Sequence, residues 1–116
     1  MAHLIKKSTG LTGLKVLKNP REELISVYNK IIKTLQAVPD NAAYKGYAMT
    51  TVKERLTVVQ NEMDPNMIEK KIGCGQCEEL LVQAENELSL ARRFVIDKPW
   101  EPLANQPPPN QWKWPI

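Results

Sequence analysis

Two cysteines separated by two residues, Cys74 and Cys77, are the most obvious candidates for chemistry in this chain of 116 residues. A CxxC motif at the start of a helix lowers the pKa of a thiol and supports disulfide exchange. Thioredoxin-like enzymes present that motif where a strand meets a helix, whereas the residues before Cys74 have a helical pattern. Cys77 also falls on an apolar helix face, where a buried and unreactive thiol is expected. A small CxxC thiol-disulfide oxidoreductase is therefore the alternative interpretation of the chain, not the preferred one.

Other catalytic or metal-binding patterns are sparse. A zinc site would need two further ligands beside the cysteines, and the remaining candidate of the usual kind is His3, far away in the sequence. The carboxylate neighbours Glu78 with Glu79 and Glu85 with Glu87 do not share a helix face, so their spacing does not pair them for acid–base catalysis. No P-loop or Gly-x-Ser-x-Gly motif occurs. We expect no catalytic residue, no metal site and no cofactor.

The first predicted helix spans about residues 20–38. Asn19 can cap it, Pro20 suits the first helical position, and Glu22 and Glu23 favour the positive end of the helix dipole. Pro39 ends the helix. Apolar residues spaced three and four apart place one face in a core, namely Leu24, Val27, Tyr28, Ile31, Leu35 and Val38.

A second helix is predicted from a cap at Asp40 or Asn41 to about Glu62. Its apolar stripe consists of Tyr44, Tyr47, Ala48, Val52, Leu56 and Val59. Asp64 and Pro65 then repeat the combination of cap and proline, which predicts a short third segment up to Gly73.

The last helix begins near Gly75 and has the most regular pattern. Its apolar residues step by four and three, the spacing of a seam that packs along a partner helix; they are Cys77, Leu81, Ala84, Leu88, Ala91 and Val95. Strand patterns are absent from the sequence. Since three amphipathic helices cannot bury their stripes singly, we predict an all-α fold, a small antiparallel three-helix bundle over residues 20–98.

Residues 99–116 have a different composition, because they hold all three tryptophans and six of the nine prolines. Prolines at this density forbid a helix, so we predict an extended C-terminal docking arm. Aromatic side chains on a stiff segment lose little entropy on binding. They would bind either the bundle's own surface or another protein. The predicted partner-binding residues are Trp100, Pro102, Trp112, Trp114 and Pro115. An SH3-type ligand at Pro107–Pro109 is a further alternative, but no basic residue lies beside these prolines.

Residues 1–19 form a basic N-terminal arm that includes Lys6, Lys7, Lys15 and Lys18 and no acidic residue. Such a segment is compatible with a mitochondrial import signal or with a short solvated arm. It contains no aromatic residue for base stacking, so nucleic-acid binding is not favoured. The apolar runs of the chain are too short to cross a bilayer.

The C-terminal motifs closely resemble a known family. They are Lys98-Pro99-Trp100-Glu101-Pro102-Leu103, Pro107-Pro108 and Gln111-Trp112-Lys113-Trp114-Pro115-Ile116, and the similarity continues upstream at Lys6–Leu11, Asn41–Tyr44 and Gln83–Leu88. The family that they resemble is alpha subcomplex subunit 5 of mitochondrial complex I, the NADH:ubiquinone oxidoreductase.

The resemblance implies a non-catalytic accessory subunit of the matrix-facing peripheral arm of the complex. It would lie on the matrix side of the mitochondrial inner membrane, as a peripheral protein without a membrane span. Its partners would be other complex I subunits, especially the core subunits of the quinone-reducing module, and it would not be a homo-oligomer. It would carry no flavin, iron–sulfur cluster or quinone ligand. Gly-Gly-Gln-Leu is typical of the family where this chain has Cys74 to Cys77, which implies a packing role for Cys77.

Overall fold

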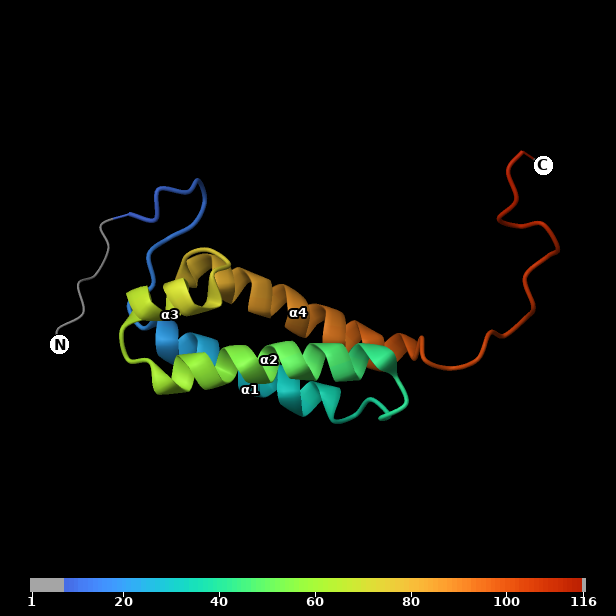
Figure 1. The fold of residues 1–116 in the computed structure, drawn as a ribbon, viewed down its shortest axis with the longest axis horizontal. Helices are drawn as coiled ribbons and strands as arrows, with labels where there is room; N and C mark the ends of the chain where they lie inside the picture. Colours follow the sequence, from blue (N-terminus) through green and yellow to red (C-terminus); the bar gives the residue numbers. More distant parts are fainter. Residues whose placement is uncertain (1–7, 116) are drawn as a thin grey trace.

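The computed structural model describes residues 8–115, which contain four helices and no strand (Figure 1). The predicted all-helical class is therefore confirmed. The helices are α1 (Pro20–Leu35), α2 (Ala43–Asn61), α3 (Pro65–Ile72) and α4 (Cys77–Asp97). The predictions made for His3, Lys6, Lys7 and Ile116 lie outside the described residues.

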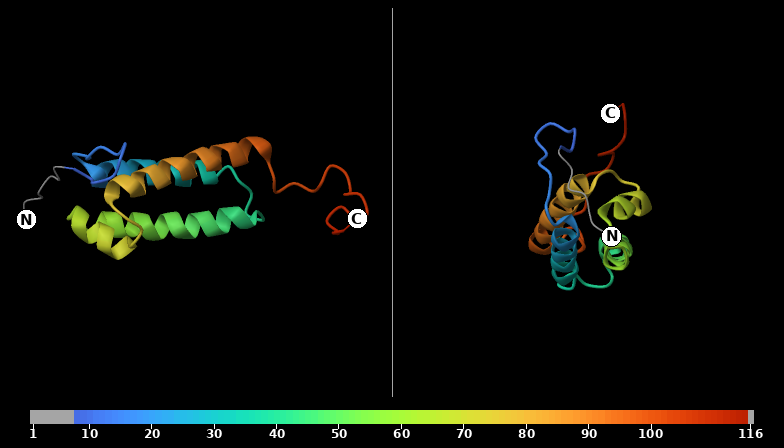
Figure 2. Two further views of the ribbon diagram at one scale, coloured as in Figure 1. Left: turned by 90° about the horizontal axis from the view of Figure 1, so that it is seen from above. Right: turned by 90° about the vertical axis from the view of Figure 1, so that its left-hand side faces the viewer.

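Helix α1 is the middle element of the fold, because it packs against both α4 and α2 while α2 and α4 contact each other far less. Figure 1 shows α2 running back along α1 and α4 running in the same direction as α1. The end-on view in Figure 2 shows α2 apart from α4. The predicted apolar face of α1 is buried throughout, with Leu24, Ile31 and Leu35 at 0% exposure. An apolar stripe of this width on the central helix can serve two neighbours at once.

Helix α1 ends at Leu35, three residues before the predicted end. The next residues form tighter turns, in which Ala37 N–H donates to Thr34 O at 3.2 Å and Val38 N–H donates to Leu35 O at 3.0 Å. Bonds over three residues commonly finish an α-helix. Val38 thus stays buried at 2% exposure although it lies outside α1.

The predicted cap of the second helix is wrong, because α2 begins at Ala43 and its N-cap residue, Ala42, has no side chain that could cap. The Asp40 carboxylate instead accepts a hydrogen bond from Lys45 Nζ at 2.7 Å. This hydrogen bond and the lysine charge hold the pKa of Asp40 below its usual value. Asp40 therefore pairs with Lys45 and does not cap α2.

The starts of the last two helices follow the sequence signals more closely. The Asp64 carboxylate accepts a hydrogen bond from Asn66 N–H at 3.0 Å and caps α3, which ends at Gly73 in the left-handed conformation. Gln76 and Glu79 form a capping box at the start of α4. Gly75 has φ +108°, and a Cβ there would lie 1.9 Å from Glu79 Oε2. Glycine is therefore required beside this capping box.

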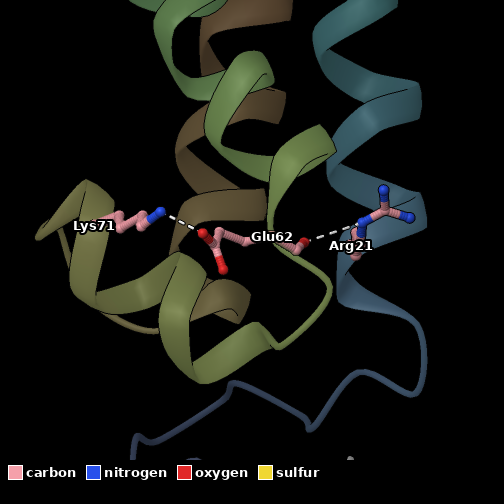
Figure 3. Close-up of polar contacts among 3 residues, drawn as sticks. All are labelled: Arg21, Glu62 and Lys71. Atoms are coloured by element: carbon pink, nitrogen blue, oxygen red, sulfur yellow. Dashed lines mark hydrogen bonds and ion pairs between the residues drawn. The ribbon is translucent and has the colours of Figure 1, made fainter. Parts of the chain in front are cut away.

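Arg21 joins the start of α1 to the end of α2. Its guanidinium donates to three carbonyl oxygens near the end of α2, those of Val59 at 2.9 Å, Gln60 at 3.0 Å and Glu62 at 3.2 Å. Figure 3 shows the Glu62 carboxylate directed away from Arg21 and paired with Lys71 of α3. These contacts hold α1, α2 and α3 together at one end of the molecule.

The segment before α1 contacts the start of α4. Gln76 Nε2 donates to Thr9 O at 2.7 Å, and the Thr9 hydroxyl donates to Leu14 O at 2.8 Å. Leu17 N–H donates to the buried Glu78 carboxylate at 3.4 Å. Residues 9–17 are thus bonded to the helical part of the chain.

Candidate functional site

Of the predicted partner-binding residues, Trp100 is the one that packs on the helices. Its ring centroid lies 5.5 Å from that of Phe94 on α4, and the Phe94 centroid lies 4.4 Å from that of Tyr44 on α2. Both pairs are tilted, an arrangement that suits aromatic quadrupoles. The three rings form a row, here called the aromatic row, that fixes where the C-terminal segment leaves α4.

The rest of the C-terminal segment lies on the surface. Pro102 and Pro115 are exposed, and Trp112 and Trp114 are 90% and 88% exposed. Large indole rings are normally buried on one side at least. The two tryptophans therefore present apolar area that residues 8–115 do not cover.

The C-terminal segment is not extended throughout, which differs from the prediction. Gln111 N–H donates to Pro108 O at 3.2 Å, and Lys113 N–H donates to Asn110 O at 3.1 Å. Asn110 has a positive φ of 68°, which asparagine tolerates better than most residues. Two consecutive turns thus precede Trp114, so strict alternation along an extended strand does not set the directions of the two tryptophans.

A second feature is a groove of about 590 Å³ between α2 and α4. Buried Tyr28 and Ile31 of α1 form its floor. The α2 wall consists of Tyr44, Tyr47, Ala48, Thr51, Val52 and Arg55, and the α4 wall of Gln83, Ala84 and Glu87. Sequence reasoning missed this groove, although the stripe from Tyr44 to Val52 was the signal that could have indicated it.

Polar groups lie at both ends of the groove. At one end the Tyr44 hydroxyl donates a hydrogen bond to the Glu87 carboxylate. At the other end the Arg55 guanidinium donates to Gln83 Oε1 at 3.0 Å and contacts Cys74 Sγ at 3.4 Å. Tyr44 and Arg55 are three helical turns apart along α2, but the side chains that they bond, Glu87 and Gln83, are one turn apart on α4, about 6 Å at about 1.5 Å per residue. The groove is therefore acidic at one end and basic at the other.

Two tyrosines of the groove, Tyr28 and Tyr44, have raised pKa values. Burial raises the pKa of Tyr28, and the nearby Arg55 charge offsets part of that rise. The pKa of Tyr44 is raised first by burial and then by its hydrogen bond to the Glu87 carboxylate. The Tyr28 hydroxyl is fully enclosed by the protein and interacts with the Arg55 side chain.

The CxxC motif lies between α3 and α4, with one exposed and one buried free thiol. Cys74 is exposed near Arg55, whereas Cys77 is 1% exposed and its Sγ lies 3.5 Å from Pro65 O. The residues before the motif are helical, as the sequence predicts. Cys77 thus occupies a packing position at the start of α4.

Within residues 8–115 no group of three or more histidine, cysteine, aspartate or glutamate side chains could hold a metal ion. No helix in that range is long and apolar enough to cross a membrane.

Comparison with known proteins identifies the class. Residues 13–79 match the family described as ETC complex I subunit conserved region, which covers more than half of the chain. The chain belongs to this family of complex I subunits.

Individual relatives show which subunit of complex I the chain is similar to. The chain is 50% identical over its full length, and over the full length of the relative, to NADH dehydrogenase [ubiquinone] 1 alpha subcomplex subunit 5 of Bos taurus. It is 48% identical over the same span to the protein of that name from Rattus norvegicus. It is also 47% identical to the probable subunit 5 of Caenorhabditis elegans, over 96% of this chain and 74% of that protein. The resemblance derived from the C-terminal motifs is therefore confirmed.

Proposed function

We propose that this protein is a non-catalytic accessory subunit of the mitochondrial respiratory-chain NADH dehydrogenase, complex I. The observation that carries the proposal is the full-length similarity, at 50% identity, to a protein named as subunit 5 of the alpha subcomplex. Such a subunit packs on the peripheral arm and supports its assembly and stability. Electron transfer from NADH to ubiquinone then belongs to the cofactors of other subunits.

The proposed location is the matrix side of the mitochondrial inner membrane, with the protein held there by other subunits. The proposed partners are core subunits of the quinone-reducing module, rather than nucleic acid or a second copy of the chain. In this arrangement residues 20–98 act as an antiparallel three-helix bundle of α1, α2 and α4, to which α3 is attached. Residues 99–116 act as the docking arm.

The exposed indoles support a docking role for the arm. Trp112 and Trp114 place two large apolar rings in water, whereas Trp100 anchors the start of the arm on Phe94. Burying such rings against a partner yields about 25 cal/mol for each Å² of apolar surface removed from water. Tryptophan is also among the residue types that most often dominate binding energy at interfaces.

The test uses cells that lack this protein and that express tagged variants of the full chain. Native gels of solubilised mitochondria measure the fraction of the protein within complex I. The variant Trp112→Ala with Trp114→Ala should lower that fraction at least about tenfold, as expected when two aromatic anchors are lost. Asn105→Ala with Gln106→Ala changes exposed polar residues of the same segment and serves as the matched control.

The experiment tests membership of complex I and the docking role of residues 99–116 independently. If the unaltered protein migrates only as a free small protein, membership of complex I is overturned. If the unaltered protein enters the complex and the double tryptophan variant enters equally well, the docking role of the arm is overturned.

Protease treatment of mitochondria stripped of the outer membrane tests the proposed location on the matrix side, because a matrix protein stays protected until the inner membrane is opened.

A further inference from the structure

Two free thiols lie at the turn between α3 and α4, beside polar side chains of α1 and α2. Cys74 is exposed, and Cys77, the first residue of α4, is 1% exposed. The Arg55 guanidinium donates to Cys74 Sγ at 3.4 Å. Burial chiefly raises the pKa of Tyr28, the Arg55 charge offsets part of that rise, and both thiols add to it. Both sulfurs are therefore close to the Tyr28 hydroxyl and are neighbours in space as well as in sequence.

The two thiols differ in access, and this difference suits the two steps of disulfide exchange. In the first step an accessible thiolate attacks a disulfide and forms a mixed disulfide. Cys74 is the accessible thiol of this chain. In the second step a neighbouring thiol of the same chain attacks the mixed disulfide, and Cys77 lies three residues away. The exposed and the buried cysteine thus divide the two steps between them.

A pocket of about 300 Å³ between α2 and α3 lies beside the exposed thiol. Cys74 Sγ contacts the Arg55 guanidinium at 3.4 Å and Ile72 O at 3.6 Å, and both of these residues line the pocket. Lys71 adds a second cation to the lining, and Glu54 adds one acidic side chain. Oxidised glutathione is an anionic peptide disulfide, so its carboxylates fit the basic side of a pocket that ends at the thiol.

We propose that Cys74 and Cys77 form a redox-sensitive pair, which a small-molecule disulfide of the glutathione type converts into an intramolecular disulfide. Cys74 attacks one sulfur of oxidised glutathione, the bond between the two glutathione sulfurs breaks, and one glutathione thiolate leaves. Cys77 then attacks the Cys74 sulfur, and the second glutathione thiolate leaves. Each leaving thiolate takes up the proton that a cysteine has given up. Two protein thiols are thus oxidised, and one oxidised glutathione is reduced to two thiols.

The turn between the two cysteines is short enough to close on a disulfide. Three peptide units span at most about 11 Å, and the chain bends at Cys74 and Gly75, which shortens that span. A disulfide needs Cα atoms within about 7 Å of each other. Gly73 and Gly75 flank Cys74 with positive φ, so the backbone on both sides of the exposed thiol can adjust. Cys77 Sγ, which lies 3.5 Å from Pro65 O, must turn away from α3 to reach Cys74.

Closure of the disulfide should loosen α3 from the start of α4. In the reduced chain Cys77 joins the two helices, since its Sγ contacts Pro65 O and its N–H donates to Glu69 Oε1 at 3.0 Å. A helix of eight residues depends on such tertiary contacts for its stability. Disulfide formation takes the sulfur away from Pro65, so the amides of α3 should exchange hydrogen faster, whereas those of α1 should not change. The pair thus links oxidation to the order of α3.

The test equilibrates the purified full chain with mixtures of reduced and oxidised glutathione. Alkylation after acid quenching, followed by intact-mass spectrometry, separates free thiols, glutathione adducts and the internal disulfide. We expect the unaltered chain to reach the internal disulfide, and Cys77→Ala to stop at the glutathione adduct of Cys74. Cys74→Ser is the matched control, and its one remaining thiol is buried, so it should form an adduct at least about tenfold more slowly.

Charge variants test the pocket as the binding site of the oxidant. Arg55→Gln removes the cation beside Cys74 and should slow the first exchange with anionic oxidised glutathione about three- to tenfold. Lys53→Gln removes the same charge from an exposed position of α2 outside the pocket lining and should leave the rate unchanged. Hydrogen exchange measured by mass spectrometry compares the reduced and oxidised chains, and α3 should exchange at least about fivefold faster after oxidation.

Three products would overturn the pair. They are a final product that keeps glutathione on Cys74, a disulfide between two chains, and a chain whose thiols stay free in oxidised glutathione alone. Equal rates for Arg55→Gln and Lys53→Gln would overturn the pocket as the binding site of the oxidant, and unchanged exchange in α3 would overturn its release. The proposed function is tested apart from these results, because entry into complex I is measured with the thiols reduced.

Discussion

The Tyr44 hydroxyl of α2 donates a hydrogen bond to the Glu87 carboxylate of α4. The bond joins two helices that otherwise contact each other little, and it closes the acidic end of the groove. Tyr44 also stacks on Phe94, so its ring belongs to the aromatic row while its hydroxyl belongs to the groove. Tyr44 therefore belongs both to the aromatic row, on which the C-terminal segment begins, and to the wall of the groove.

Replacement of Tyr44 with Phe should lower the free energy of unfolding by about 1 kcal/mol. The variant keeps the aromatic row and removes only the hydrogen bond to a charged acceptor, whose value is reduced because the site is partly exposed. Urea unfolding of the purified chain measures the change. Tyr47→Phe, at a 78% exposed position, is the matched control and should stay within about 0.5 kcal/mol of the unaltered chain. Equal stability of all three proteins would contradict the role of this bond.

The same hydrogen bond predicts a dependence of stability on alkaline pH. Folding raises the pKa of Tyr44, first through burial and then through Glu87, so the folded chain holds the hydroxyl proton more tightly than the unfolded chain. The stabilisation is complete below the unfolded tyrosine pKa of about 10 and is lost as pH rises above it. Unfolding midpoints measured between neutral pH and pH values above about 10 should fall more steeply for the unaltered chain than for Tyr44→Phe. Parallel curves would show that the tyrosine does not contribute.

Replacement of Arg21 with Met should destabilise the chain by about 2 kcal/mol, because the guanidinium satisfies three carbonyls at the end of α2. Methionine keeps much of the side-chain length and removes the donors. Arg93→Met is the control, since Arg93 pairs with exposed Asp97 on α4 and such surface pairs contribute about 0.5 kcal/mol or less. Thermal unfolding compares the two variants, and equal losses would contradict a special role for Arg21.

The sequence predicted α1 and α4 better than α2, for a physical reason. Every residue predicted on the apolar face of α1 is buried, and so are Cys77, Ala84 and Leu88 of the α4 seam. Periodicity reports that a face is apolar, but it does not report what covers that face. The stripe of α2 was recognised, yet the exposure of Tyr47 depends on how far apart α2 and α4 lie. The groove therefore could not be derived from spacing alone.

Local signals failed where a side chain had a competing partner. Asp40 fits a helix cap by type, but the chain places it against Lys45, and α2 starts later. The Gln76 cap was missed, since its capping box depends on a reciprocal bond with Glu79. The predicted partner-binding tryptophans divide in a similar way, with Trp100 seated on Phe94 and the other two exposed. Sequence shows which residues are able to bind and leaves open which of them find a partner within the chain.

Replacement of Gly46 with Ala should stabilise the chain by about 0.5–1 kcal/mol. Gly46 lies inside α2, and a Cβ at this position would have no atom within 4 Å. Alanine lowers the conformational entropy of the unfolded chain and favours the helix. Gly75→Ala makes the same chemical change where φ is +108° and the Cβ would collide with Glu79, so it should destabilise instead. Shifts of the same sign for both variants would contradict the described conformations.

Removal of both thiols separates a packing role of the CxxC motif from a redox role. The variant Cys74→Ser with Cys77→Ala should cost about 1 kcal/mol, since Cys77 is 1% exposed and loses one buried sulfur, whereas Cys74 is exposed. Incorporation into complex I and NADH-to-ubiquinone electron transfer should match those of the unaltered chain, because the proposed docking residues are the tryptophans of residues 99–116 and not the thiols. The single variant Cys77→Ala should account for the whole loss of stability. Normal stability combined with lost electron transfer would instead favour the dithiol oxidoreductase, since only a chemical role makes activity depend on thiols that folding does not require.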